Sequence, residues 1–224
     1  MTAAEKPSES SVSSLFDHAD QLLFKQRKYG EAESLYRQIL ESEPTNVYAI
    51  NSIAYCVKFT AASSQTALPD NLFETLHSLY QRSLAIDALD IEANFNLGLL
   101  YLQFNQEMHL ALQAFQKCVR PDVDEDSKEL FRAQRAKSHY NIGMIHDKLH
   151  QFESAADSYK RAMDTCEGDP KQQLTKSITY KKAGTNYAVT LEKINKREAA
   201  IATLTALKDV FGSEVRVFNN LGII

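Results

Sequence analysis

The sequence predicts an all-α fold in which helix pairs repeat along the chain, and three observations support this prediction. Among its 224 residues the chain has only seven glycines and five prolines, which favours helices over a turn-rich β fold. An asparagine stands two residues before a small residue in four segments that are typical of helices. A triplet of residues suited to a core then follows these segments at a nearly constant spacing.

The asparagine motif is the most regular feature of the chain. It occurs in the segments FNLGLLY, YNIGMIH, TNYAVTL and NNLGII. A polar amide at one register in successive helices is hard to explain by packing, and it indicates a row of hydrogen-bonding side chains along one surface. The four asparagines are Asn96, Asn141, Asn186 and Asn220, and the small residues after them are Gly98, Gly143, Ala188 and Gly222.

The triplet predicts a second helix in each pair. Twelve residues after Gly143 comes Ala155, followed by Tyr159 and Ala162 at helical spacing. Small residues allow two helices to approach closely, and aromatic side chains fill the gaps between them. The other copies are Ala32, Tyr36 and Ile39; Ala111, Phe115 and Cys118; Ala200, Leu204 and Leu207; and, less well, Leu76, Tyr80 and Ser83.

These residues resemble the tetratricopeptide repeat family. The pattern of that family is a Leu-Gly pair, a downstream aromatic residue, Ala-x3-aromatic and a closing proline. The resemblance covers about residues 13–224, and it implies an α-solenoid, a right-handed superhelix of about five helix pairs plus a final unpaired helix. The best matches are Leu97-Gly98 with Tyr101, Ile142-Gly143 with Ala155 and Tyr159, and Leu221-Gly222.

The chain departs from the family pattern in two ways. The closing proline survives only as Pro44, and the tryptophan position holds Asn94, His139, Gly184 and Phe218. The intervals between the small residues are also uneven: starting from Ala54 they are 44, 45, 45 and 34 residues. The longer intervals predict extended helices or inserted loops.

Taken in chain order, the triplets and the small residues predict five helix pairs. Stacking explains why they must repeat, because each pair buries only part of its apolar face and its neighbour completes the burial. The predicted helices span 13–26 and 29–43, 47–60 and 71–87, 91–104 and 107–119, 126–148 and 152–167, and 170–194 and 197–211, with a lone helix from 214. A disordered Ser-rich tail is expected over 1–12, before a repeat domain over 13–224 with units near 13–46, 47–90, 91–135, 136–180 and 181–214 and a partial unit at 215–224.

The resemblance also implies where a partner binds. In this family the first helix of each pair lines the concave face, which usually binds a peptide. Residues three or four apart share one face of a helix, so the asparagines define the predicted groove. Its residues are Phe95, Asn96, Leu99, Lys137, Tyr140, Asn141, Met144, Lys182, Asn186, Val189, Arg216 and Asn220.

The predicted groove has a definite chemistry. Amide side chains donate and accept at once, which suits a peptide backbone, while Lys137, Lys182 and Arg216 add a positive edge. The expected ligand is a protein or peptide with an acidic group or a C-terminal carboxylate beside an apolar anchor. The alternative is that the asparagines only bond to neighbouring helices and orient the stack.

Some members of the family bind chaperone C-termini through a clamp of Lys, Asn and Arg that holds two carboxylates. Asn141 and Lys182 match two of the clamp positions. The other positions hold Phe95, Leu99 and Asn186, so the clamp is incomplete and chaperone binding is a minor alternative.

Other function classes find little support in the sequence. A net charge of −4 gives no reason to expect nucleic-acid binding, and no apolar stretch is long enough to span a membrane. The three cysteines and the missing signal segment favour reduced thiols and a cytoplasmic location. Phosphate-loop, metalloprotease and nucleophile-elbow motifs are missing, and no cofactor or metal is expected. The sequence therefore predicts a non-catalytic scaffold or adaptor.

The last residues, VRVFNNLGII, begin another first helix without a second helix to cover it. We expect the chain to be part of a longer repeat array, with self-association through this helix as the alternative. A different class of function also stays open. Glycosyltransferases of the O-linked N-acetylglucosamine type carry a similar asparagine row, so the chain would then be the regulatory or substrate-docking region of a larger enzyme.

Overall fold

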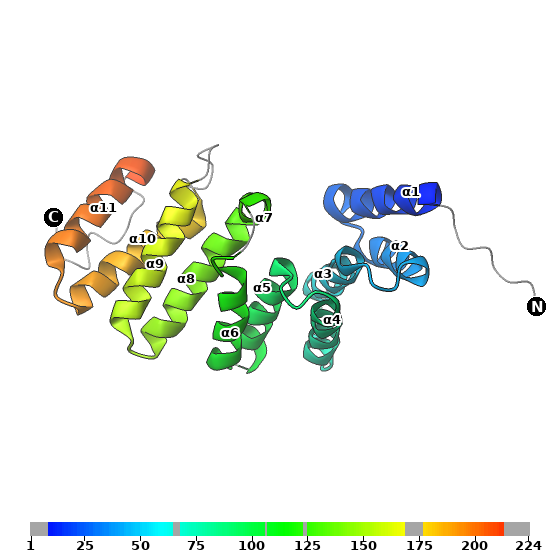
Figure 1. Ribbon diagram of the computed structural model, residues 1–224, viewed down its shortest axis with the longest axis horizontal. Helices are drawn as coiled ribbons and strands as arrows, with labels where there is room; N and C mark the ends of the chain where they lie inside the picture. Colours follow the sequence, from blue (N-terminus) through cyan, green and yellow to red (C-terminus); the bar gives the residue numbers. More distant parts are fainter. Residues whose placement is uncertain (1–8, 65–67, 106, 123–124, 169–176, 213–224) are drawn as a thin grey trace, which may run out of the picture. The chain divides into compact units, whose positions relative to one another are not determined.

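The computed structural model describes residues 9–64, 68–105, 107–122, 125–168 and 177–212, and these residues are helical apart from short connections (Figure 1). No strand occurs within these ranges. The helices form two compact units, Met1–Gln106 and Glu107–Ile224. In each unit, helices that follow one another in the chain pack together, as expected of an α-solenoid.

The first unit is a succession of packed helices. α1 packs on α2, α2 on α3, α3 on α4 and α4 on α5. Two π-helical segments, η1 and η2, directly continue α1 and α5, and the sequence did not predict them. The elements are α1 (Glu9–Asp20), η1 (Gln21–Gln26), α2 (Tyr29–Ser42), α3 (Val47–Ser63), α4 (Leu72–Ile86), α5 (Ile91–Leu100) and η2 (Tyr101–Asn105).

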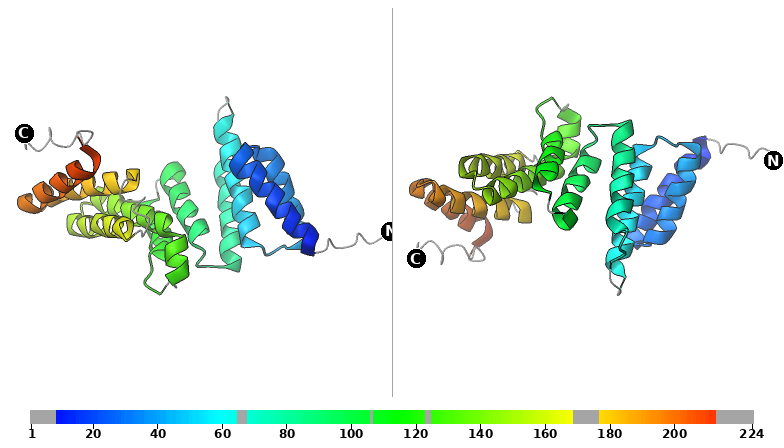
Figure 2. Two further views of the ribbon diagram at one scale, coloured as in Figure 1. Left: turned by 90° about the horizontal axis from the view of Figure 1, so that it is seen from above. Right: turned by 90° about the horizontal axis from the view of Figure 1, so that it is seen from below.

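The second unit repeats this arrangement. α6 packs on α8, and α8, α9, α10 and α11 each pack on the next, while α8 also touches α10 (Figures 1 and 2). The first helices of two successive pairs are therefore neighbours. The elements are α6 (Met108–Cys118), α7 (Glu125–Leu130), α8 (Arg132–Lys148), α9 (Phe152–Glu167), α10 (Ile178–Lys193) and α11 (Arg197–Phe211).

Several helix boundaries differ from the predicted ones. α1 begins at Glu9, before the predicted start at 13, and it buries Val12. The helix expected over 126–148 is broken at Phe131, whose backbone (φ −103°, ψ 19°) separates α7 from α8. Ser177 is extended and its hydroxyl accepts a hydrogen bond from the amide of Tyr180, so α10 begins at Ile178 rather than at 170. Residues 170–176 and the lone helix expected from 214 lie outside the described residues.

The predicted triplets form the core. In the second unit Ala155, Tyr159 and Ala162 are almost completely buried, and the triplet of α11 is fully buried. A β-carbon on Gly143 would stand 2.6 Å from the Tyr159 ring, closer than side chains normally approach. The small residue and the aromatic residue of the motif therefore fit against each other where α8 crosses α9.

Asp90 fixes the start of α5 in the first unit. Its carboxylate accepts a hydrogen bond from the amide of Ala93 at 2.7 Å and caps the helix. The same oxygen accepts a second hydrogen bond from Nδ2 of Asn51, on α3, at 2.9 Å. One side chain thus starts α5 and ties it to α3.

Candidate peptide-binding surface

The predicted groove residues of the second unit lie on α8 and α10, which contact each other. Lys137 and Lys182 are exposed, and neither forms an ion pair within the described part of the chain. Met144 and Val189 are half-buried apolar side chains in the same two helices. Positive charge and partly exposed apolar surface are therefore present on neighbouring first helices.

The asparagines take part in the packing of the repeats. Nδ2 of Asn186 donates to the hydroxyl of Tyr159 at 3.3 Å, and the amide also interacts with Tyr140. The Tyr140 ring lies 5.9 Å from the Tyr159 ring, and burial raises the pKa of both tyrosines. Asn186 thus joins α10 to α8 and α9. Asn141, on α8, is more deeply buried than Asn186, with 8% of its surface exposed.

The first unit places its predicted residues differently. Nδ2 of Asn96 donates to the carbonyl of Glu92 one turn earlier, at 3.0 Å. Phe95 is only 9% exposed, and Leu99 is half-buried but does not line the pocket described below. Arg216 and Asn220 lie outside the described residues, so the groove prediction is not tested there.

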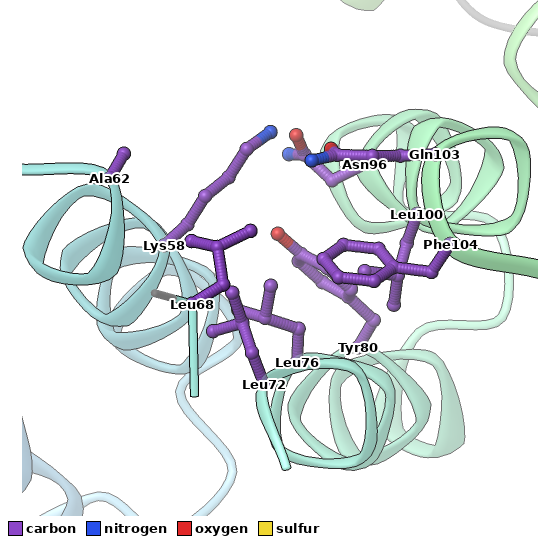
Figure 3. Close-up of a pocket in the computed structure, with 10 residues that line it drawn as sticks. All are labelled: Lys58, Ala62, Leu68, Leu72, Leu76, Tyr80, Asn96, Leu100, Gln103 and Phe104. Atoms are coloured by element: carbon purple, nitrogen blue, oxygen red, sulfur yellow. The ribbon is translucent and has the colours of Figure 1, made fainter. Parts of the chain in front are cut away.

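A pocket of about 80 Å³ lies between α3, α4 and α5 with η2, and Asn96 lines it (Figure 3). Its apolar wall consists of Leu68, Leu72, Leu76, Leu100 and Phe104. Figure 3 shows that the Lys58 amine and the side-chain amides of Asn96 and Gln103 gather at one end, with the Tyr80 hydroxyl pointing to the same side. The remaining lining residue is Ala62.

Lys58 is the unusual member of this pocket. It is half-buried on α3, and no described carboxylate pairs with its amine. Burial lowers the pKa of Lys58, because the charged amine loses contact with water. An amine that is partly desolvated and unpaired favours binding of an anionic group.

Comparison with known protein families finds a match to the tetratricopeptide repeat over residues 136–168, which covers α8 from Ala136 onward and all of α9. Residues 136–168 thus match one tetratricopeptide repeat. The match coincides with the helix pair in which Gly143 meets Tyr159. Comparison of the sequence with curated proteins finds no match.

Solved structures show the same fold at low sequence identity. MamA is 15% identical, with a TM-score of 0.60 over 91% of this chain and 93% of that protein's chain. MamA from Desulfovibrio magneticus RS-1, residues 41 to the end, is 12% identical, with a TM-score of 0.62 over 95% and 99% of the two chains. YrrB, described as a tetratricopeptide repeat protein with an unusual peptide-binding site, is 14% identical, with a TM-score of 0.61 over 92% and 89%.

Sequence reasoning missed Lys58. The four residues Tyr55, Lys58, Phe59 and Ala62 share one face of α3 at helical spacing, and Lys58 is the charged member of that face. A lone lysine within an apolar helix face was the available signal. The repeat motif concealed it, since the asparagine register marks a different position of each first helix.

One departure from the tetratricopeptide pattern, the histidine at the tryptophan position, fits the packing of α8. His139 occupies the tryptophan position in α8, and burial lowers its pKa to about 4, with Arg135 and Arg161 adding to the effect. The imidazole is therefore neutral at physiological pH and packs as an uncharged ring.

Within the described helices, none is long and apolar enough to cross a bilayer.

Proposed function

We propose that the chain is a non-catalytic scaffold whose first helices bind a segment of a partner protein. The observation that carries the proposal is the surface of α8 and α10. Lys137 and Lys182 are exposed at equivalent positions of adjacent first helices, beside half-buried Met144 and Val189. Core packing requires neither the exposed charges nor the incompletely covered apolar side chains.

The chemistry of the partner follows from these side chains. Carboxylates of a partner segment, either acidic side chains or a C-terminus, would lie near Lys137 and Lys182. An apolar side chain would contact Met144 and Val189. Since Asn186 already donates within the protein, its Oδ1 is the atom best placed to accept from a peptide N–H. The exposed charges would chiefly affect the association rate and the register of the partner.

The experiment begins with a random peptide library displayed on phage and selected on the chain. We expect the selected peptides to be acidic and to contain an apolar residue. Their affinity should fall about tenfold in the double variant Lys137→Ala/Lys182→Ala, mainly through slower association, because two positive charges that attract the acidic peptide are removed. The dissociation constant, measured by fluorescence anisotropy, checks this.

The matched control is Lys117→Ala/Lys196→Ala, which removes the same charge from two exposed lysines outside α8 and α10. It should leave the affinity within about twofold, because screened charges at a distance contribute little. Equal losses in the two double variants would mean that net charge attracts the peptides, and the proposed surface would be wrong.

A further inference from the structure

The pocket between α3, α4 and α5 belongs to the first unit, whereas α8 and α10 belong to the second. It combines a wall of leucine and phenylalanine side chains with one amine and two amides at a single end. An apolar chamber beside a few converging polar groups is the usual composition of a ligand site.

Lys58 determines the charge of the ligand. A half-buried charge without a partner raises the free energy of the free protein, and a bound carboxylate would relieve that cost. Gln103 is exposed at the same end of the pocket, and its amide can donate to the second carboxylate oxygen. The π-helical segment η2 brings Gln103 to the polar end of the pocket and Phe104 to its apolar wall.

The volume of the pocket limits the apolar part of the ligand. A dry protein cavity of roughly 150 Å³ holds a benzene molecule. At about 80 Å³, this pocket suits one small branched aliphatic side chain.

Because the polar end and the apolar wall of this pocket lie close together, they favour the C-terminal residue of a chain as the ligand. In a C-terminal residue the carboxylate and the side chain are attached to the same α-carbon, so both can enter one small pocket. In an extended peptide, by contrast, the side chains of an internal acidic residue and its neighbour point to opposite sides.

We propose that this pocket binds the C-terminal residue of a partner protein, with the terminal carboxylate at Lys58 and a branched aliphatic side chain against Leu72, Leu100 and Phe104. The assignment rests on the proposed scaffold function and adds a second recognition point to it. The ligand class is a protein C-terminus ending in leucine or a residue of similar size.

N-acetyl-leucine tests the assignment, with N-acetyl-leucinamide as its uncharged counterpart. Both are titrated to about 50 mM into the ¹⁵N-labelled 224-residue chain and followed by amide chemical shifts. We expect saturable shifts around Leu72, Leu100 and Phe104 with a millimolar dissociation constant, the range usual for so small a ligand. The amide should bind at least about tenfold more weakly, because it lacks the charge that pairs with Lys58. Absence of saturable shifts, or equal binding of acid and amide, would overturn the proposal.

Lys58→Met tests the role of the amine while keeping a long apolar side chain. Binding of N-acetyl-leucine should fall about tenfold or more, and binding of the amide should not fall. Thermal unfolding should show no loss of stability, since a half-buried charge has been removed. Lys117→Met, on the exposed face of α6, is the matched control and should bind as the parent does. Unchanged acid-to-amide selectivity in Lys58→Met would show that the lysine serves packing alone.

N-acetyl-aspartyl-leucinamide separates the two sources of a carboxylate. It carries the charge on an internal side chain, and we expect it to bind more weakly than N-acetyl-leucine. Binding at least as tight would contradict recognition of a C-terminus. The scaffold proposal is tested independently, because display-selected peptides that depend on Lys137 and Lys182 would support it even if the Lys58 pocket bound no carboxylate.

Discussion

Gly143 and Tyr159 show how single residues of the repeat motif determine the distance between two helices. The Tyr159 ring occupies the space that a β-carbon on Gly143 would need. The ring is almost completely buried, so it has little freedom to move away. The small residue of the motif is therefore a requirement of packing, and Asn141, two residues earlier, is itself buried.

We predict that Gly143→Ala destabilises the protein by about 1–3 kcal/mol, because the added methyl group overpacks this contact. Gly30→Ala is the control. Gly30 lies in α2, and nothing stands within 4 Å of the place that an alanine methyl group would take. Because alanine also favours a helix there, stability should stay the same or rise by up to about 1 kcal/mol. Chemical denaturation measures both, and equal effects of the two substitutions would mean that the Gly143 contact is not tight.

The same residues explain what the sequence could reveal. Ala155, Tyr159 and Leu204 are predicted core residues and are buried, because spacing along a helix directly determines which side chains face a neighbour. For Lys58 the local pattern shows only a lone lysine on an apolar face of α3. Its importance depends on the walls that α4 and η2 contribute from elsewhere in the chain, and spacing along one helix does not report them.

At the scale of elements, some helix ends could be predicted from the repeat pattern and others could not. α9 and α11 have their predicted bounds, 152–167 and 197–211, and a hydrogen-bonded turn precedes each of them. The break at Phe131, the cap at Ser177 and the two π segments depend on backbone geometry that the repeat pattern does not encode. η2 matters most of these, because it brings Gln103 and Phe104 to the pocket beside α3 and α4.

Asp90 gives a prediction for one such helix end. We expect Asp90→Ala to destabilise the protein by about 1–2 kcal/mol, since it removes the cap of α5 and leaves the Asn51 amide without its acceptor. Asp90→Asn should cost less, because it keeps an acceptor and because burial already raises the pKa of Asp90 against the charged form. Asn71→Ala is the control, as Asn71 caps α4 without a side-chain hydrogen bond. An unfolding midpoint for Asp90→Ala equal to that of Asn71→Ala would contradict this role.

At the scale of the whole molecule, the proposed function requires that the first helices stay available to a partner. Both units carry features that the repeat core does not need: exposed Lys137 and Lys182 on α8 and α10, and the unpaired amine of Lys58 beside an apolar pocket. The second helices supply the buried triplets instead. This division between packing and recognition is what makes the chain a scaffold in our account.

Lysine footprinting with a display-selected peptide tests that account most directly. The chain is acetylated briefly with and without saturating peptide, and mass spectrometry gives the rate at each lysine. The account predicts that Lys137 and Lys182 become several times slower to react, while Lys117 and Lys196 keep their rates. Protection of Lys117 or Lys196 without protection of Lys137 and Lys182 would contradict binding by the first helices.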